Sequence, residues 1–423
     1  MVDSTSLNNP RTLNAWAFFD WANSAFALVI TVAIFPAYFI EVTNDSIELG
    51  SFTTSNSVLY AFAISGSYLI IALFSPLLSG IADYGGRRMF FMRFFTILGA
   101  LACLALFFFQ GMEQLWFGTT MFMVAMIGFA GGLVFNNAYL PLIATPDRFD
   151  RVSARGYAYG YIGSVILLVT CLIIIEFANT LGLPEGTFPV RLSFLLVGLW
   201  WLGFSLIPFR RLPADERVRH PQLIRKGFEE LKLVWASAKK QRDLRFFLGA
   251  FFSFIAGVQT VLFLAATFAE KELNFGTSQL ILLILLLQVL AIGGAYLFAF
   301  LSDQKGNKYS LTLMLIIWTL ICIIAYFVDG QGPFYALAAG VGLVMGGIQS
   351  VARSTYSKII PETTEDTTSY FSFYDVLEKV AIVMGTLLFG ILEQLTGSMR
   401  ISILVLSLFF VSGMLLLRPV KIR

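Results

Sequence analysis

Charged residues are scarce in this chain, and their scarcity excludes a water-soluble fold. Only 13% of the 423 residues are Asp, Glu, Lys or Arg, whereas 57% are hydrophobic and the mean hydropathy is +0.79. A soluble domain carries about 25% charged residues and about 45–50% apolar ones. We therefore expect an integral membrane protein with lipid as the solvent for most of its surface.

Cysteine and histidine, the usual residues of metal sites, are also rare. Cys103, Cys171 and Cys322 lie in separate apolar runs, where a thiol usually behaves as a small hydrophobic group. The single histidine, His220, has no cysteine or carboxylate near it at metal-ligand spacing, so we expect neither a zinc site nor a cofactor. A nucleophile paired with a base is not apparent either, which argues against an enzyme.

Two binding signatures are missing as well. No Gly-x-x-x-x-Gly-Lys-Ser/Thr loop is present to bind a nucleotide, which excludes ATP hydrolysis as an energy source. Nothing in the sequence resembles a nucleic-acid-binding patch of clustered basic and aromatic residues, so we expect no nucleic-acid partner. The partners that remain are a small-molecule substrate, protons and membrane lipids, and we expect a monomer.

Long apolar runs, in contrast, are abundant. A helix needs roughly 20 apolar residues to cross about 30 Å of hydrocarbon, and twelve stretches come within the range that tilting and kinking allow. The runs are continuous instead of alternating over about ten residues, which excludes a β-barrel and predicts an all-α membrane protein. The twelve predicted helices cover residues 14–40, 57–82, 89–110, 115–142, 155–179, 191–209, 245–269, 278–301, 309–328, 333–357, 368–393 and 399–417.

Lysine and arginine are distributed unevenly over the connections between these runs. Both termini and the even-numbered connections hold 25 of the 29, and the opposite side holds only Arg191, Lys271 and Arg400. The positive-inside rule therefore places both termini in the cytosol. The first apolar run is too long for the core of a cleaved signal peptide. Short loops without a targeting segment favour a bacterial inner membrane.

A short charged turn occurs twice, at the same place in each half of the chain. Its pattern is Asp-x-x-Gly-x-basic, and the two copies, Asp83 to Arg88 and Asp303 to Lys308, are 220 residues apart. In both copies the turn lies between two apolar runs. Such a repeat is typical of membrane transporters built from two similar helix bundles.

The longest hydrophilic stretch divides the predicted helices into six and six. We therefore predict an N-terminal half at 1–209, a cytoplasmic connection at 210–244 and a C-terminal half at 245–423. The connection has apolar residues at helical spacing, namely Ile224, Phe228, Leu231, Trp235 and Ala238. Two interpretations stay open: an amphipathic helix on the inner membrane face, or a solvated linker helix packed on the bundle.

Motifs in four of the predicted helices carry a resemblance to a known family. They are Phe19 to Phe26 in the first helix, Asn137 to Pro141 in the fourth, Gly346 to Gln349 with Arg353 in the tenth, and Phe373 to Asp375 with Lys379 and Gly385 in the eleventh. With the duplicated turn, they resemble the Unknown Major Facilitator family of the major facilitator superfamily, which includes the yeast vacuolar amino-acid effluxer of autophagy. The turn departs from the superfamily pattern in having Tyr84 where a basic residue is common.

This resemblance implies the major facilitator fold and secondary transport by alternating access, with a small neutral amino acid as substrate. Coupling is then to a gradient, such as that of protons, or is absent. Two alternatives remain: a transporter of larger amphipathic solutes such as peptides or cell-wall fragments, and a non-transporting membrane receptor.

Ionisable side chains inside the predicted helices are the candidates for substrate binding and coupling, because they are costly to bury in lipid. Asp20 shares one face of the first helix with Asn23 and Ser24. Asp20 either binds and releases a proton during transport, or stays ionised and pairs with a basic group that holds helices together.

The predicted helix at 368–393 carries three charged residues, Asp375, Glu378 and Lys379. Lys379 lies roughly 16 Å from the cytoplasmic start of this helix, near the membrane midplane. It either forms an ion pair with Asp375, four residues earlier, or binds an anionic group of the substrate, with Asp20 on the ammonium group of a zwitterion. Glu378 points to a different side and can pair with another helix.

Other polar residues complete the expected site. Asn137, Tyr157, Tyr161 and Gln349 supply hydrogen-bond donors and acceptors for substrate binding, although such groups also bond between helices. The charged residues at the cytoplasmic ends are predicted to act in gating and not as substrate ligands. This second group is Asp83, Arg87, Arg88, Asp303, Lys308 and Arg353.

Overall fold

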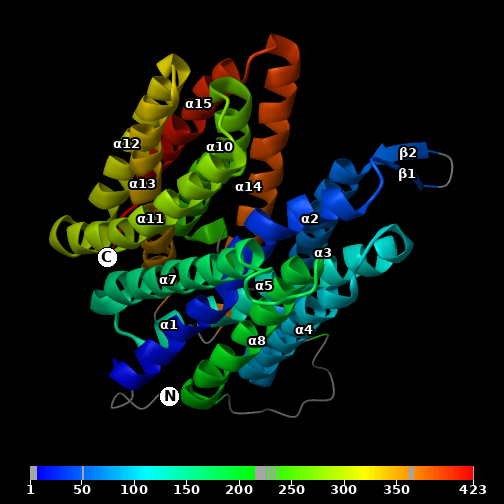
Figure 1. The fold of residues 1–423 in the computed structure, drawn as a ribbon. Helices are drawn as coiled ribbons and strands as arrows, with labels where there is room; N and C mark the ends of the chain where they lie inside the picture. Colours follow the sequence, from blue (N-terminus) through cyan, green and yellow to red (C-terminus); the bar gives the residue numbers. More distant parts are fainter. Residues whose placement is uncertain are drawn as a thin grey trace. The chain divides into compact units, whose positions relative to one another are not determined.

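The structure, a computed structural model, describes residues 7–49, 52–214, 239–361 and 366–422, together with 225, 229, 232 and 235–237 (Figure 1). The chain divides into two compact units. The N unit comprises Pro10–Asn137 and Tyr159–Gly227. The C unit comprises Ala138–Ala158, the chain from Phe228 onward and the residues before Pro10. The division into halves at 1–209 and 245–423, which we inferred from the sequence, stays a prediction.

Long apolar helices make up the N unit. Its first span, Pro10–Val42, is helical throughout, with a π-helical stretch, η1, between α1 and α2. Pro36 lies in the first turn of α2, where the missing N–H of a proline is tolerated. The elements are α1 (Pro10–Ala25), η1 (Phe26–Ile34), α2 (Phe35–Val42), α3 (Asn56–Gly85), α4 (Arg88–Ala105), η2 (Leu106–Phe108), η3 (Met112–Gln114), α5 (Leu115–Ala138) and α8 (Phe188–Arg211).

The C unit contains the last six long helices and two short elements that precede α7. Helix α7 (Phe149–Glu176) begins in the C unit and ends in the N unit. The other elements are α6 (Leu140–Ile143), η4 (Pro146–Arg148), α10 (Arg242–Leu273), α11 (Thr277–Lys305), α12 (Asn307–Phe327), α13 (Gln331–Ile359), α14 (Thr367–Thr396) and α15 (Met399–Leu417).

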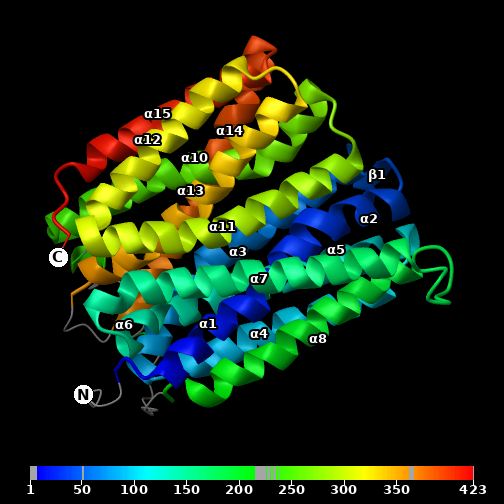
Figure 2. The same ribbon diagram turned by 60° about the vertical axis from the view of Figure 1, so that its left-hand side comes forward.

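Glycines let α11 and α13 pack with their backbones in near contact. A Cβ atom on Gly346 of α13 would meet the carbonyl oxygen of Ala291 in α11, and one on Gly294 of α11 would meet the carbonyl oxygen of Leu343 in α13. Small residues at such seams are typical of helix packing in membranes. In the same unit α12 lies beside α15, as Figure 2 shows.

The duplicated charged turn joins α3 to α4 in the N unit and α11 to α12 in the C unit. Both of its glycines adopt a left-handed backbone, with φ of 56° at Gly86 and 85° at Gly306. A residue with a Cβ atom is strained in that conformation, which explains why the turn needs glycine at this position in both copies.

The prediction of a helical membrane protein is confirmed. Within the described residues, eleven helical spans are long and apolar enough to cross a membrane, and each corresponds to a predicted helix. The twelfth predicted helix is α14, which is 30 residues long and carries the three charges at Asp375, Glu378 and Lys379. A small antiparallel hairpin of β1 (Ser46–Leu49) and β2 (Phe52–Ser55) was not predicted.

Most of the predicted amphipathic helix in the connection, including Ile224, Phe228, Leu231 and Ala238, lies outside the described residues, as does His220. The described part reaches the start of α14. Trp235 stacks on Phe373 with ring centroids 5.3 Å apart, and Tyr370 and Ser237 form a hydroxyl hydrogen bond of 3.1 Å.

Candidate functional site

In the N unit, the predicted polar face of α1 is buried. Asp20 and Asn23 are 3% and 1% exposed. The amide nitrogen of Asn23 donates to the carbonyl oxygen of Phe129 at 3.4 Å, while Asn23 Oδ1 has no hydrogen-bond partner within the described part of the chain. Gly160 lets α7 approach α1 closely, since a Cβ atom there would lie 2.7 Å from Ser24 Oγ.

In the C unit, Asp375, Glu378 and Lys379 form one cluster on α14, which we call the α14 triad. Lys379 Nζ lies 3.2 Å from Asp375 Oδ1 and 3.2 Å from Glu378 Oε2. The side chains of Asp375 and Lys379 are each 6% exposed, and that of Glu378 is 19% exposed. Gln259 of α10 donates to Glu378 Oε1 at 3.1 Å, so Glu378 does pair with another helix, as the sequence suggested.

The remaining predicted binding residues fall in both units. Asn137, at the end of α5, and Tyr161, in α7, belong to the N unit and are almost fully buried. Gln349 of α13 and Tyr157 of α7 belong to the C unit and are half-buried. The structure therefore brings the α14 triad together, while the role of these four residues in binding stays a prediction.

Helix α13 holds the first turns of α7 through a buried arginine. Arg353 is 1% exposed; its Nε donates to Ser153 Oγ and its Nη2 to the Ser153 carbonyl oxygen, both at 2.9 Å. The guanidinium carbon lies 4.2 Å from the ring centroid of Tyr157, a cation–π contact. Ser153 Oγ in turn donates to the carbonyl oxygen of Ser350 at 2.7 Å.

A second buried network, which we call the Asp150 network, lies beside it. Asp150 of α7 is 1% exposed and has its carboxylate 2.5 Å from Lys358 Nζ. Asn307 donates to Asp150 Oδ1 at 2.6 Å and accepts from Lys358 Nζ at 2.7 Å, and Ser354 donates to Asp150 Oδ1 at 2.5 Å. The buried Asp150 carboxylate thus links the start of α7 to α12 by a hydrogen bond and to α13 by a hydrogen bond and an ion pair.

The predicted gating residues form contacts within their own units. Asp83, whose side chain is fully buried, pairs with Arg88 at 2.9 Å in the N unit. In the C unit, Asp303 pairs with Arg151 of α7, whose side chain is 72% exposed. Lys308 donates to the carbonyl oxygen of Val420 at 3.1 Å, close to the C-terminal end of the described chain. The backbone N–H of Arg87 closes the first copy of the turn by donating to the carbonyl oxygen of Ala82 at 2.9 Å.

Sequence reasoning did not identify the Asp150 network or the role of Ser153. The charge distribution assigned Lys358 and Arg151 to the cytoplasmic side, but it gave no signal that joins either one to a residue far away in the chain. Groups of three or more His, Cys, Asp and Glu side chains that could hold a metal ion are not found among the described residues.

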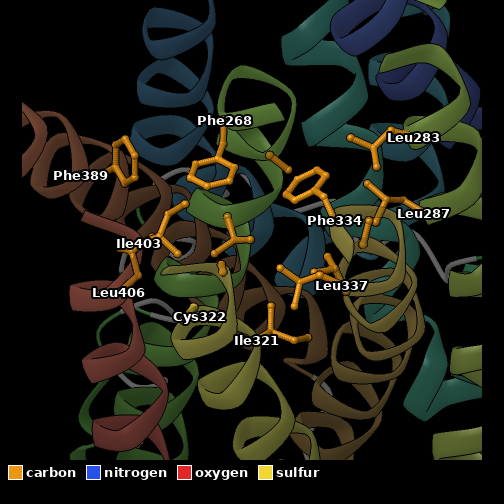
Figure 3. Close-up of a pocket in the computed structure, with 15 residues that line it drawn as sticks. Phe268, Leu283, Leu287, Ile321, Cys322, Phe334, Leu337, Phe389, Ile403 and Leu406 are labelled. Carbon is orange, nitrogen blue, oxygen red and sulfur yellow. The ribbon is translucent and has the colours of Figure 1, made fainter. Parts of the chain in front are cut away.

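The C unit also contains an apolar cavity of about 40 Å³, shown in Figure 3. All six helices from α10 to α15 contribute to its wall, and its fifteen lining residues are all hydrophobic, among them Phe268, Leu287, Cys322, Phe334 and Leu406. Such a lining offers nothing to a charged or polar solute, so the α14 triad is the better candidate for the site in this unit.

Comparison with protein families gives a match to the family described as Vacuole effluxer Atg22 like, over residues 8–423. The Bacillus subtilis protein described as the uncharacterized MFS-type transporter YxiO is 30% identical over 406 residues, which cover 96% of this chain and 93% of that protein. Autophagy-related protein 22 of Saccharomyces cerevisiae is 28% identical over 422 residues, covering 85% of this chain and 78% of that protein.

Solved structures of transporters share the fold. The major facilitator transporter FucP, in an outward conformation, superposes with a TM-score of 0.73 at 15% identity over 99% of this chain and all of that chain. The human organic anion transporter MFSD10 gives a TM-score of 0.73 at 13% identity, covering 96% of this chain and 99% of that one. At such identities the likeness concerns the fold alone.

Proposed function

Because this chain belongs to the Atg22-like family of major facilitator transporters, we propose that it carries a small zwitterionic solute, a neutral amino acid, across a membrane by alternating access. The family match covers residues 8–423, and the relatives are transporters and not enzymes. Transport by a multi-pass membrane protein is therefore the activity of the whole chain. The substrate class, the gate and the coupling to protons are the proposed part.

The observation that carries the substrate class is the buried α14 triad. Three formal charges on one membrane helix are costly, and apolar packing would hold the helix at less cost. Lys379 Nζ already faces two carboxylates at 3.2 Å. A substrate carboxylate can replace one of them and form a charge-assisted contact of the same kind. The assignment of Asp20 to the substrate ammonium comes from the sequence and stays a prediction.

We assign the gate to the contacts that hold the start of α7 against α12 and α13. Alternating access requires the two halves to rock, and α7 is the helix that begins in the C unit and ends in the N unit. The Asp150 network and the Arg353–Ser153 contacts join the predicted halves at 1–209 and 245–423, so rocking of those halves would break and re-form these contacts once in each cycle. The exposed ion pair of Arg151 and Asp303 adds little to the free energy needed to open the gate, because water screens the two charges.

The orientation that we propose places both termini and the connection at 210–244 in the cytosol, since 25 of the 29 lysines and arginines lie on that side. In this orientation the Asp150 network lies at the cytoplasmic ends of α7, α12 and α13, where we place the proposed gate. The membrane that we propose is the inner membrane of a bacterium.

Flux measurements on purified protein in liposomes test the function. We expect saturable uptake of a labelled neutral amino acid, competition by other neutral amino acids, and little competition by their amidated analogues. Lys379→Ala should weaken binding of the carboxylate form more than binding of the amidated form, because only the former loses the contact to the ammonium group. Uptake of peptides or cell-wall fragments in place of amino acids would support the alternative of larger solutes. Ligand binding without flux would favour a receptor.

A further inference from the structure

The α14 triad contains one negative charge more than its positive charge balances. Asp375 and Glu378 each carry a carboxylate, and Lys379 supplies a single ammonium group. Both Asp375 and Lys379 are almost completely buried. An unbalanced buried charge is costly, and a site with two carboxylates usually relieves that cost by binding one proton. The triad therefore has a place for one additional positive charge.

The hydrogen bonds of the triad identify the carboxylate oxygen at which a proton can bind. Glu378 Oε1 accepts from Gln259 at 3.1 Å, and Glu378 Oε2 accepts from Lys379 at 3.2 Å. Asp375 Oδ1 faces Lys379 at 3.2 Å. Asp375 Oδ2 is buried and has no hydrogen-bond partner in the described residues. Three of the four oxygens are thus engaged, and the fourth belongs to Asp375.

Helices α10 and α15, which pack against α14 in the C unit, carry no titratable residue over long stretches. On α10 the stretch from Phe246 to Ala269 contains no titratable residue, and Gln259 is its polar contact with the triad. On α15 the stretch between Arg400 and Arg418 contains none either.

The titratable groups on the α13 side contact the residue next to Asp375. Tyr356 of α13 packs on Tyr374 of α14 with ring centroids 4.9 Å apart. Arg353 of α13 and Tyr157 of α7 interact electrostatically with Tyr374. The strongest electrostatic neighbours of Asp375 are Lys379 and Glu378 on its own helix.

We propose that Asp375 Oδ2 binds the transported proton, and that this protonation releases Lys379 for the carboxylate of the substrate. The proton enters from water and forms an O–H bond at Oδ2, which leaves Glu378 and Lys379 as a neutral pair. One of the two carboxylates that lie 3.2 Å from Lys379 Nζ is then neutral, and the carboxylate of the substrate replaces it as an ion-pair partner of Lys379. The part that concerns the substrate rests on the proposed function; the protonation of Asp375 does not.

Infrared difference spectroscopy between low and high pH tests the protonation on purified protein without substrate. We expect a carboxylic-acid C=O band that disappears in Asp375→Asn. In Glu378→Gln the band should persist and titrate at lower pH, because Asp375 then faces Lys379 without a competing carboxylate. Glu272→Gln is the matched control, since Glu272 pairs with Arg400 at 2.9 Å away from the triad, and this variant should leave the band unchanged.

Three results would overturn the assignment. A band that is lost in Glu378→Gln and kept in Asp375→Asn would move the proton to Glu378. A band that neither substitution changes would move it outside the triad. Stabilisation of the protein by sodium ions at high pH, without any carboxylic-acid band, would make the ligand a metal cation. Glu378→Gln keeps the test valid if Asp375→Asn does not fold.

A binding measurement tests the link to the substrate. If a proton must bind before the carboxylate, the affinity of the wild-type protein for a neutral amino acid should fall about tenfold per pH unit above the titration point of the infrared band. In Asp375→Asn, which resembles the protonated state in charge, the affinity should not depend on pH in that range. If the infrared band behaves as predicted but the affinity does not depend on pH, the release of Lys379 is refuted and the protonation of Asp375 is not. Absence of any amino-acid binding would refute the proposed substrate and leave the infrared result standing.

Discussion

Replacing Lys358 with methionine should increase the population of an open state, in which the start of α7 has separated from α13. Lys358 is the one cation in the Asp150 network, and the Asp150 side chain is 1% exposed. Removing one partner of a buried ion pair costs about 3–5 kcal/mol, because the other charge is left uncompensated. At about 1.4 kcal/mol for each factor of ten, the open state should become between about a hundred and a few thousand times more populated.

The assay is the rate at which a thiol reagent labels a cysteine introduced at Ser350, which is fully buried beside Ser153. The native cysteines are buried, so background labelling is low. If opening is fast compared with labelling, the rate should rise by the same factor as the open population.

Two further variants sharpen the test. Asp150→Asn combined with Lys358→Met should label more slowly than Lys358→Met alone, because the uncompensated charge is gone. Arg151→Gln removes an exposed ion pair in the same region and should change the rate by no more than about fivefold. Equal rates in Lys358→Met and in the parent protein would refute the assignment of this network to the gate.

Three more predictions follow from the charge distribution and the packing. Cysteines at Asp45 and Glu185 should react with an impermeant reagent in intact cells, and protection of both would overturn the proposed orientation. Asp83→Asn removes the buried carboxylate that faces Arg88 and should slow flux far more than it weakens equilibrium binding; a large loss of binding with normal conformational exchange would place Asp83 in the site. Gly346→Val should destabilise the protein by about 1–3 kcal/mol through overpacking against the α11 backbone. An unchanged midpoint of thermal unfolding would contradict that close packing.

The long helices could be predicted because each depends on a local signal, a continuous apolar run. The run at 309–328 is α12, Asn307–Phe327, with both ends within two residues of the prediction. The hairpin of β1 and β2 could not be predicted in this way, because each strand has four residues and the pairing depends on contacts across the turn. The π-helical stretch η1, Phe26–Ile34, lies within the continuous apolar run at 14–40, and an apolar run does not distinguish a π-helix from an α-helix.

The candidate site could be predicted where its residues share one helix. Asp375 and Lys379 are four residues apart, so their contact follows from helix geometry. The contact of Lys379 with Glu378 was not expected, because neighbouring residues leave a helix in different directions; the long lysine side chain reaches back to it. Asp150 was missed because its partners lie more than 150 residues away in the chain, and the sequence of one protein does not pair distant positions.

The apolar cavity among α10 to α15 has a mechanical consequence. About 40 Å³ is enough for a few water molecules, yet its hydrophobic lining keeps such a space dry. Empty volume makes a bundle compressible, so hydrostatic pressure should act on the C unit at this place first. Helices that slide past one another also need free volume for their side chains to change rotamer. The cavity supplies that volume beside Phe389 of α14, about three helical turns from Lys379.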